Sequence, residues 1–359
     1  MAPGLAAPNL AGGDLQSYAV DARGDLWGWG NAAKGALGDG RKEAHSAPAI
    51  IQGIANVKAV ASGRGFVLAV TGDGALWSWG DNRSGQLGDG TFKNRATPQK
   101  IVGLSDVTAI AAGEEFGLAL RKDGTVWSWG RDSYGQLGDG TNNDRAKPAP
   151  IAGLKNAISL AAGAYHSLAV TIDGRVWSWG KNADGQLGNG NLDDSSVPAP
   201  IAGFGGAKSV AAGWGHSLAL REDGSVWAWG GNGTLAVGDG AKIVSSPNKT
   251  EVVGATQIAA GNWHSLALLQ DGTVVAWGNN GTGQLGDGGT DSRGKPAAVK
   301  DLNGATQIAA GAWDSLAMAG GKVWAWGNNS TLQLGVAGDE VVKAPVEVAG
   351  VSMASLDEK

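Results

Sequence analysis

The sequence predicts an all-β fold, a seven-bladed β-propeller of about 50-residue repeats, and two observations carry this prediction. A Trp-x-Trp-Gly motif or its equivalent recurs seven times, with its second tryptophan at 29, 79, 129, 179, 229, 277 and 326, so the steps are 50, 50, 50, 50, 48 and 49 residues. The chain also holds 62 glycines and 16 tryptophans, a composition that favours tight turns joined to repeated aromatic packing positions. A repeat of this length favours one closed ring of sheets over several unrelated domains.

The repeat divides residues 1–359 into a single propeller. Its units span approximately 11–60, 61–110, 111–160, 161–210, 211–258, 259–308 and 309–356. In unit 161–210, alternation places Tyr165 and His166 on opposite sides of a strand, and Asp173-Gly174 is typical of a tight hairpin turn. The tryptophan strand, a glycine-rich loop over 181–190 and a span containing Pro198 follow. Each unit therefore predicts four strands, with the motif tryptophans packed between blades.

Ring closure is expected to involve the two chain ends. The chain starts inside a unit, with a predicted strand over 15–20, and ends with apolar segments at 346–348 and 351–356. An open ring would leave an unpaired strand edge that invites aggregation. We therefore expect residues 351–356 to pair beside the strand at 15–20.

Composition excludes several classes of function. Lysine and arginine total 28 against 33 acidic residues, a net charge of -5, so we expect no nucleic-acid partner. The absence of cysteine excludes disulfides and thiolate chemistry. No apolar run reaches the ~18–20 residues that a membrane span needs, so no membrane partner is expected. The first residues lack a signal-like pattern, which leaves a cytoplasmic protein or an extracytoplasmic one whose signal has been removed. We expect a monomer.

Three segments of unit 161–210 carry a resemblance to a known family. They read Ala-Ala-Gly-Ala-Tyr-His-Ser-Leu-Ala-Val, Asp-Gly-Arg-Val-Trp-Ser-Trp-Gly and Gly-Gln-Leu-Gly-Asn-Gly. They resemble the regulator of chromosome condensation repeat family over nearly the whole chain, and this resemblance implies a seven-bladed propeller. The family includes a nuclear exchange factor for a small GTPase, a plant UV-B photoreceptor and a secreted β-lactamase inhibitory propeller. Its members share mostly a binding surface.

The sequence departs from each of these members. The exchange factor depends on a protruding insertion and a basic arm, whereas the units here are uniform and carry no basic arm, so exchange activity is not expected. The segment 213–217 lacks the arginine of the photoreceptor motif. Tyr165, Trp263 and Trp313 match the aromatic position of the inhibitor, but the Gly-Gln-Leu-Gly-Asp-Gly loops that the inhibitor lacks are present here.

The units differ most just after the glycine that ends each alanine-rich strand. We expect the first two of these positions to line one end of the propeller near its central opening. The partner-binding candidates are Arg64, Glu114, Glu115, Tyr165, Trp214, Trp263, Trp313 and Asp314. Tyrosine and tryptophan are frequent anchors of protein interfaces. We therefore predict a non-enzymatic module that binds a protein partner of unknown identity through one face, although the same rings also suit simple packing between blade tips.

Two other functional classes stay open. One is a structural or engineered repeat scaffold without a dedicated ligand, and the other is a small-molecule binder or enzyme that uses the central funnel. The sequence offers no recognisable nucleophile, cofactor motif or metal set, so no catalytic residue, cofactor or metal is predicted.

Three groups of polar residues favour structural roles over chemistry. His166, His216 and His264 recur at one repeat position, which favours packing over a zinc site. Adjacent Glu114 and Glu115 suit a solvated edge with Arg64 better than an acid–base pair. The Gly-Asp-Gly loops favour turns over phosphate or calcium sites, and their aspartates are Asp89, Asp139, Asp239 and Asp287.

Overall fold

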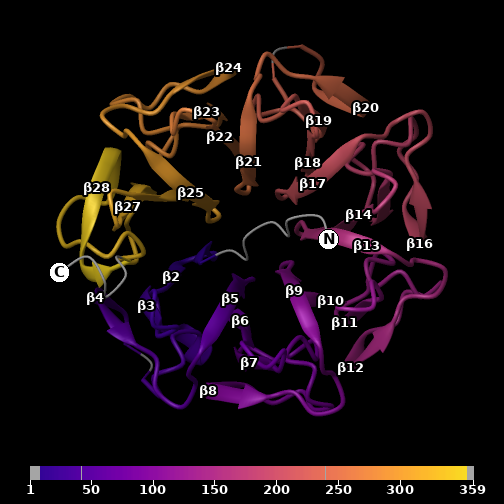
Figure 1. Ribbon diagram of the computed structural model, residues 1–359, viewed down its shortest axis with the longest axis horizontal. Helices are drawn as coiled ribbons and strands as arrows, with labels where there is room; N and C mark the ends of the chain where they lie inside the picture. The colour runs from indigo at the N-terminus through magenta and orange to yellow at the C-terminus, as the bar shows by residue number, and fades with distance from the viewer. Residues whose placement is uncertain (1–8, 42, 239, 354–359) are drawn as a thin grey trace.

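The computed structural model describes residues 9–41, 43–238 and 240–353. Seven antiparallel four-stranded sheets stand around a central axis (Figure 1), which confirms the all-β, seven-bladed propeller. Each sheet is built from four consecutive strands that run from the axis outward. In the described ranges there is no helix long and apolar enough to cross a membrane.

The first four blades follow one plan. Blade 1 contains β1 (Leu10–Gly12), β2 (Gln16–Val20), β3 (Leu26–Gly30) and β4 (His45–Ile50), with a short 3-10 turn η1 (Ala33–Gly35). Blade 2 contains β5 (Val57–Ser62), β6 (Phe66–Thr71), β7 (Leu76–Gly80) and β8 (Arg95–Lys100). Blade 3 contains β9 (Val107–Ala112), β10 (Phe116–Arg121), β11 (Val126–Gly130) and β12 (Arg145–Pro150). Blade 4 contains β13 (Ala157–Ala162), β14 (His166–Thr171), β15 (Val176–Gly180) and β16 (Ser195–Pro200).

The last three blades keep the plan, with a longer outer strand in blades 5 and 7. Blade 5 contains β17 (Ala207–Ala212), β18 (His216–Arg221), β19 (Val226–Gly231) and β20 (Ile243–Lys249). Blade 6 contains β21 (Ala255–Ala260), β22 (His264–Leu269), β23 (Val274–Gly278) and β24 (Arg293–Ala298). Blade 7 contains β25 (Ala305–Ala310), β26 (Asp314–Ala319), β27 (Lys322–Asn328) and β28 (Val341–Ser352).

The second tryptophan of each repeat locks one blade onto the preceding one. Trp179 is fully buried, and its Nε1–H donates to the backbone carbonyl of Gln136, in the glycine-rich loop of blade 3, at 2.8 Å. All seven tryptophans make the equivalent bond at 2.8 or 2.9 Å. Gly138 is required here, because its φ is +71° and a Cβ would lie 2.8 Å from the indole nitrogen. The repeated loop and the repeated tryptophan therefore form one interlocking contact.

Backbone hydrogen bonds around the axis join neighbouring blades a second time. The N–H of Arg64 in blade 2 donates to the carbonyl of Glu114 in blade 3 at 3.0 Å. Equivalent bonds continue through the later blades, and the N–H of Ala312 in blade 7 donates to the carbonyl of Gly13 in blade 1 at 2.9 Å. These backbone hydrogen bonds therefore run from blade 2 through blade 7 to blade 1 and include the junction of the two chain ends.

The expected pairing of residues 351–356 beside the strand at 15–20 is wrong. β1 already occupies that edge, with Leu10 opposite Ala19, and β3 occupies the other. Ser352 instead pairs with Lys322 in β27, so β28 completes the outer edge of blade 7, and residues 354–356 lie outside the described residues. Sequence reasoning overlooked β1, because it has only three residues and lacks the alanine-rich pattern of the other inner strands.

The ring closes by packing between blade 7 and blade 1. Figure 1 shows the yellow β28 beside the indigo β4. Leu10 and Trp29 of blade 1 share one buried cluster with Val348 and Val351 of β28. The indole of Trp29 also donates to the carbonyl of Gln333 at 2.9 Å. The closing junction therefore uses the same tryptophan contact as every other junction.

Proline blunts the outer edge of every blade. Each outermost strand contains one at a corresponding place, namely Pro48, Pro98, Pro148, Pro198, Pro247, Pro296 and Pro345. Proline has no N–H to offer to an incoming strand. The sheet edges are therefore poor surfaces for partner binding by strand addition, and the two ends of the ring are left as the open surfaces.

Candidate functional site

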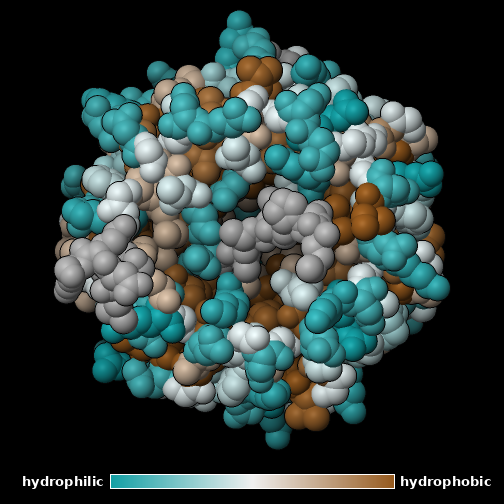
Figure 2. Space-filling view, in the orientation of Figure 1, coloured by the Kyte–Doolittle hydropathy of each residue, from teal (hydrophilic) through white to brown (hydrophobic). Residues whose placement is uncertain are grey.

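Strand direction defines the two ends of the propeller. In blade 4, β14 begins at His166, which pairs with Gly180 at the end of β15. The segment 163–165 and the loop that starts at Lys181 therefore emerge at the same end, and we call this end, with its equivalents in other blades, the tip face. The hairpin turns such as Asp173-Gly174 lie at the opposite end, which we call the turn face. Figure 2 shows one end of the ring, where hydrophobic residues are scattered among hydrophilic ones.

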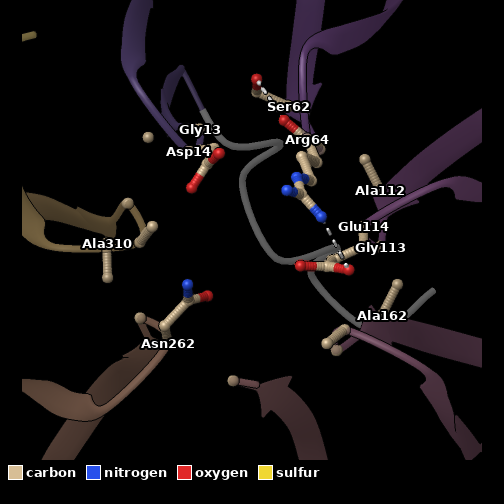
Figure 3. A pocket seen from close by; sticks show the side chains of 18 of the residues that line it. Gly13, Asp14, Ser62, Arg64, Ala112, Gly113, Glu114, Ala162, Asn262 and Ala310 are labelled. Carbon is tan, nitrogen blue, oxygen red and sulfur yellow. Dashed lines mark hydrogen bonds and ion pairs between the residues drawn. The ribbon is translucent and has the colours of Figure 1, made fainter. Parts of the chain in front are cut away.

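The central opening at the tip face is narrow and has a mixed lining. Glycines and alanines at the ends of the inner strands form most of its wall. Asp14, Arg64, Glu114 and Asn262, all at the first variable position of their blades, project toward it (Figure 3). The first variable position therefore lines the opening in every blade except blade 5, where Trp214 is not part of the lining, and second-position residues such as Tyr165 are not part of it either.

Arg64, Glu114 and Tyr165 form a linked polar group beside the opening. The guanidinium of Arg64 lies 3.8 Å from the Glu114 carboxylate and is 55% exposed. The hydroxyl of Tyr165, in blade 4, donates a short hydrogen bond to the same carboxylate. Burial, and then this bond to Glu114, raise the pKa of the Tyr165 hydroxyl well above its usual value. Tyr165 therefore stays neutral at physiological pH, and its ring is held in place by the neighbouring blade.

Glu115 is paired differently from its neighbour Glu114. Its carboxylate accepts a 2.7 Å hydrogen bond from the guanidinium of Arg131 and a 3.3 Å bond from the hydroxyl of Ser84. The Cζ atom of this Arg131 guanidinium also lies 5.7 Å from the centre of the Tyr165 ring. The two adjacent glutamates therefore belong to two ion pairs. Glu114 pairs with Arg64 as expected, but the two side chains are only 20% and 12% exposed, so they do not form the solvated edge that the sequence favours.

Four aromatic rings and one lysine form a continuous band across blades 3 to 6. The rings of Tyr165 and Tyr134 have centroids 5.3 Å apart, and those of Trp214 and Trp263 are 4.8 Å apart. The ammonium group of Lys181 lies 5.8 Å from the Tyr134 ring and 4.8 Å from the Trp214 ring, so it joins the two pairs. We call these five residues the aromatic strip. A cation held between rings gains electrostatic attraction from both.

The aromatic strip is partly exposed and rigidly supported. Tyr134, Tyr165, Trp214 and Trp263 are half-buried. The side chain of Lys181 is only 17% exposed and lies 3.6 Å from the carboxylate of Asp184. Every member therefore has a fixed neighbour on the molecule and still presents surface to solvent. Such pre-ordered aromatic surface loses little conformational freedom when it is covered.

Trp313 lies on the tip face but outside the aromatic strip. It is half-buried, and its carbonyl accepts a 3.2 Å hydrogen bond from the Thr282 hydroxyl of blade 6. The ring contacts found among the described residues do not include it. The structure thus joins three of the four predicted aromatic candidates through Tyr134 and Lys181, and leaves Trp313 one blade beyond them.

Asp314 is a correction to the predicted site. Its side chain is fully buried at the start of β26, so it is not available to a partner. Neither carboxylate oxygen has a hydrogen-bond partner in the described part of the chain, and burial, with the nearby charge of Asp14, raises the pKa of this carboxyl well above its usual value. Alignment of the repeats grouped Asp314 with its neighbour Trp313. Because adjacent side chains of a strand point to opposite sides, the Asp314 side chain points into the protein instead.

The equivalent histidines bridge neighbouring blades. The Nε2 atoms of His166, His216 and His264 lie 2.8, 3.1 and 2.9 Å from serine hydroxyls of the next blade. Each of these serines donates its own proton to a backbone carbonyl, so its oxygen accepts and the histidine Nε2 carries the proton. Burial lowers the pKa of His166 to about 3, of His216 to about 4 and of His264 to about 3. These rings are neutral packing elements.

Sequence reasoning missed two members of the aromatic strip. Tyr134 and Lys181 lie in the loops after the Trp-x-Trp-Gly motif, which repeat closely enough to look purely structural. The available signal was local variation, since the residue directly after that motif is Asp81, Arg131, Lys181 or Gly231 in successive blades. A position that varies inside an otherwise constant loop is one whose side chain is not fixed by packing between blades.

Comparison with protein families gives the same architecture. The model of the RCC1-like domain matches residues 4–254, which is more than half of the chain. The chain belongs to the RCC1-like domain family. Two further matches to the Regulator of chromosome condensation (RCC1) repeat cover residues 255–284 and 271–318. No curated protein sequence matches the chain closely.

Solved structures place this RCC1-like propeller among others of the same fold. Yeast RCC1 (Prp20), in the crystal structure of Kap60 bound to it, superposes with a TM-score of 0.82 at 25% identity, over 94% of this chain and 85% of that one. Prp20p from Saccharomyces cerevisiae, described with its binding to Gsp1p and histones, gives 0.80 at 27% identity, over 91% and 86%. Human WBSCR16 gives 0.81 at 24% identity, over 89% and 92%, and shows the fold alone.

Proposed function

We propose that this protein is a non-enzymatic interaction module that binds a protein partner through its tip face, with the aromatic strip at the centre of the contact. The observation that carries the proposal is the strip itself, because it gathers partly exposed tyrosine and tryptophan rings from four blades. Such rings supply much of the binding energy in protein interfaces. The partner proposed here is a protein and not a nucleic acid or a membrane.

The charges of the tip face support a protein partner over nucleic acid. The cationic side chains around the aromatic strip and the central opening are already paired: Arg64 with Glu114, Arg131 with Glu115, and Lys181 with Asp184. Lys34 and Arg83 share Asp81. A nucleic-acid site gains most of its affinity from unpaired cations that replace counterions on phosphates. Binding at this face should therefore depend only weakly on salt.

The central opening supports enzymatic or small-molecule function less well. Its wall consists mostly of glycine and alanine, and the carboxylate of Glu114 is engaged by Arg64 and Tyr165. Asp14, Ser62 and Asn262 are the other polar side chains of its lining in the described structure, and the Ser62 hydroxyl accepts a 3.3 Å hydrogen bond from the Gln16 amide, which is not a base. This set lacks the pairing of nucleophile and base, or of acid and base, that catalysis requires.

Family membership agrees with a binding role at a coarse level. RCC1-family propellers are typically protein binders or exchange factors. Among the solved relatives, yeast RCC1 binds Kap60, and Prp20p is described with its binding to Gsp1p and histones. We carry over from them only the class of partner, a protein, because residues of the aromatic strip are the basis of our assignment.

Partner capture with matched variants tests the proposal. Tagged wild-type protein, a Trp214→Ala/Trp263→Ala variant and a Val102→Ala/Ile172→Ala variant are used to capture proteins from the source organism, and the affinity of each is then measured with the purified partner. Val102 and Ile172 are 92% and 72% exposed and lie at the turn face, so their variant removes apolar surface without touching the strip.

The tip-face variant should weaken binding roughly 30-fold or more, about 2 kcal/mol, whereas the turn-face variant should bind like the wild type. A partner that binds the tip-face variant at wild-type affinity, or that is lost only with the turn-face variant, would contradict the proposal.

A further inference from the structure

One loop position differs between blade 3 and its neighbours in a way that packing alone does not explain. The second residue after the Trp-x-Trp-Gly motif is asparagine in five blades, namely Asn82, Asn182, Asn232, Asn280 and Asn329. Blade 3 has Asp132 there. In all six loops the side-chain Oδ1 accepts a hydrogen bond from the backbone N–H five residues later, at 2.8–3.1 Å. The six side chains are therefore oriented alike.

The side-chain Nδ2 of each asparagine is surrounded by oxygen atoms and donates hydrogen bonds to them. The Nδ2 of Asn82 donates to Asp89 Oδ1 and the Thr91 hydroxyl oxygen, both at 3.2 Å, and to the carbonyls of Thr91 and Lys93 at 3.0 and 3.1 Å. The Nδ2 atoms of the later blades bond in the same way to the carbonyls or side-chain oxygens of their own loops. The amide protons thus hold the far half of each loop against its start.

In blade 3, Asp132 has a carboxylate oxygen at the position where the five asparagines have the Nδ2 donor. Its Oδ1 accepts from the N–H of Leu137 at 2.8 Å, so its Oδ2 occupies the place of the asparagine Nδ2. The equivalents of the four acceptors around Asn82 are Asp139, the carbonyls of Thr141 and Asn143, and the Thr141 hydroxyl, which donates its own proton to Asp139 at 2.7 Å. Asp132 is fully buried, and Oδ2 has no hydrogen-bond partner among the described residues. An ionised carboxylate here faces only other acceptors, which is costly in a buried place.

We propose that Asp132 carries a proton on Oδ2 that replaces the asparagine amide protons, so that the loop over 131–145 is closed when Asp132 is protonated and loosened when it ionises. The protonated carboxyl is a donor as well as an acceptor, and it donates to the loop oxygens as the amide does in the other blades. Blade 3 is thereby the one blade among the six with this loop whose closure depends on pH.

The surrounding charges favour this proton. Burial raises the pKa of Asp132 to about 7, and the carboxylates of Asp139 and Asp144 add to the rise, while the Leu137 N–H and Arg145 act against it. Arg145 is already committed to Asp139 at 2.9 Å. The strand β16, which packs on the loop from blade 4, is Ser-Ser-Val-Pro-Ala-Pro and brings no charge. Arg145, the cation that acts on Asp132, is thus shared with Asp139 and does not offset the burial of the ionised form.

A proton fits this place better than a metal ion. The acceptors around the equivalent Nδ2 of Asn82 are 3.0–3.2 Å away, which is hydrogen-bond spacing. A divalent cation would need several oxygens at about 2.3–2.6 Å around its own volume. Across the described ranges no group of three metal-ligating side chains forms.

The pH-dependent loop also carries part of the tip face. Arg131 and Tyr134 lie in it, beside Asp132. If the proposed function holds, partner binding weakens when the loop opens above neutral pH. This consequence rests on the proposed function, whereas the proton at Asp132 does not, and the experiment below involves no partner.

Hydrogen exchange measured by NMR tests the proton at Asp132. The amide of Leu137 is compared with the amide of Leu187, which makes the same bond to Asn182 at 2.9 Å and so corrects for the pH dependence of exchange itself. From about pH 6 to about pH 8.5, protection of Leu137 relative to Leu187 should fall roughly tenfold in the wild type. In Asp132→Asn the ratio should stay constant.

The reciprocal variant, Asn182→Asp, should transfer the pH dependence to Leu187. A ratio in the wild type that does not change with pH overturns the proposal, as does an unchanged pH dependence in Asp132→Asn. Restored protection on adding calcium at the alkaline end would also overturn it, because the place would then hold a cation. The Asp132→Asn variant keeps the test valid even if Asn182→Asp does not fold, since it makes blade 3 like its neighbours.

Discussion

The junctions between blades and the tip face follow opposite rules. Each junction repeats one contact, in which an indole such as that of Trp179 donates to a loop carbonyl of the preceding blade. The tip face changes from blade to blade, with Arg64, Glu114, Tyr165 and Trp214 in related positions. The repeated residues make the contacts that hold the blades together, and the variable residues occupy positions that packing does not constrain.

The junctions themselves are not all equal. Between blades 4 and 7 a histidine bridges to a serine of the next blade, as His216 does to Ser265 at 3.1 Å. At the junction of blade 7 and blade 1, Asp314 stands at the histidine position with no hydrogen-bond partner in the described residues. The closing junction keeps the tryptophan contact but lacks the histidine bridge.

The largest expected effect comes from the repeated tryptophan. Trp179→Ala should lower the free energy of unfolding by about 3–5 kcal/mol, because it empties a fully buried site and leaves the Gln136 carbonyl without this donor. Trp177→Ala, at a half-buried site on the same strand, should cost less. Urea denaturation measures both. If both substitutions lowered the free energy of unfolding equally, the buried contact of Trp179 between blades would not be the main source of stability.

An acid-side loss of stability should come from the three histidine bridges. Their folded pKa values lie below the ordinary value of 6.5, so their stabilisation is complete above about pH 6.5 and is lost as pH falls toward 3 to 4. At about pH 5 each histidine should lower the free energy of unfolding by roughly 2 kcal/mol relative to neutral pH. His264→Gln keeps a donor for Ser315 but does not titrate, so it should flatten part of this decline in thermal unfolding. A decline as steep as that of the wild type would contradict the assignment.

A smaller effect of opposite sign is expected at the closing junction. The folded pKa of Asp314 is raised, so its contribution is complete below the ordinary carboxyl pKa near 4 and is lost as pH rises through the folded value. Asp314→Asn should therefore stabilise the protein at neutral pH by roughly 1–2 kcal/mol, and the gain should shrink toward pH ~4. Denaturation of both proteins at two pH values provides the check. A destabilised Asp314→Asn protein at neutral pH would show that the carboxylate is needed.

The fold could be predicted from the sequence because its determinants repeat. The spacing of Trp129, Trp179 and their equivalents fixes the blade number, and each loop that accepts their indole protons repeats with them. Ring closure could not be predicted, because β1 contributes only Leu10–Gly12 and has no repeat signature of its own. A strand of three residues is too short to show the alternation of apolar and polar residues by which a strand is predicted.

The grouping of residues in the aromatic strip was predicted only in part, for a different reason. Tyr165, Trp214 and Trp263 were found because they vary where their neighbours do not. Asp314 varies too, but it points inward, and one residue of shift along a strand reverses the side of a side chain. Lys181 was missed because its contact with Trp214 joins loops of different blades, and such proximity is set by the ring and not by the local sequence.

The most direct test of the separation between junction and face is Trp263→Ala, measured for both unfolding and binding. If the tip face is the partner site, urea denaturation should give a free energy within about 1 kcal/mol of the wild type, while affinity for the captured partner falls by about 2 kcal/mol or more. A loss of stability as large as that of Trp179→Ala, together with unchanged affinity, would make Trp263 a packing residue and contradict the proposed site.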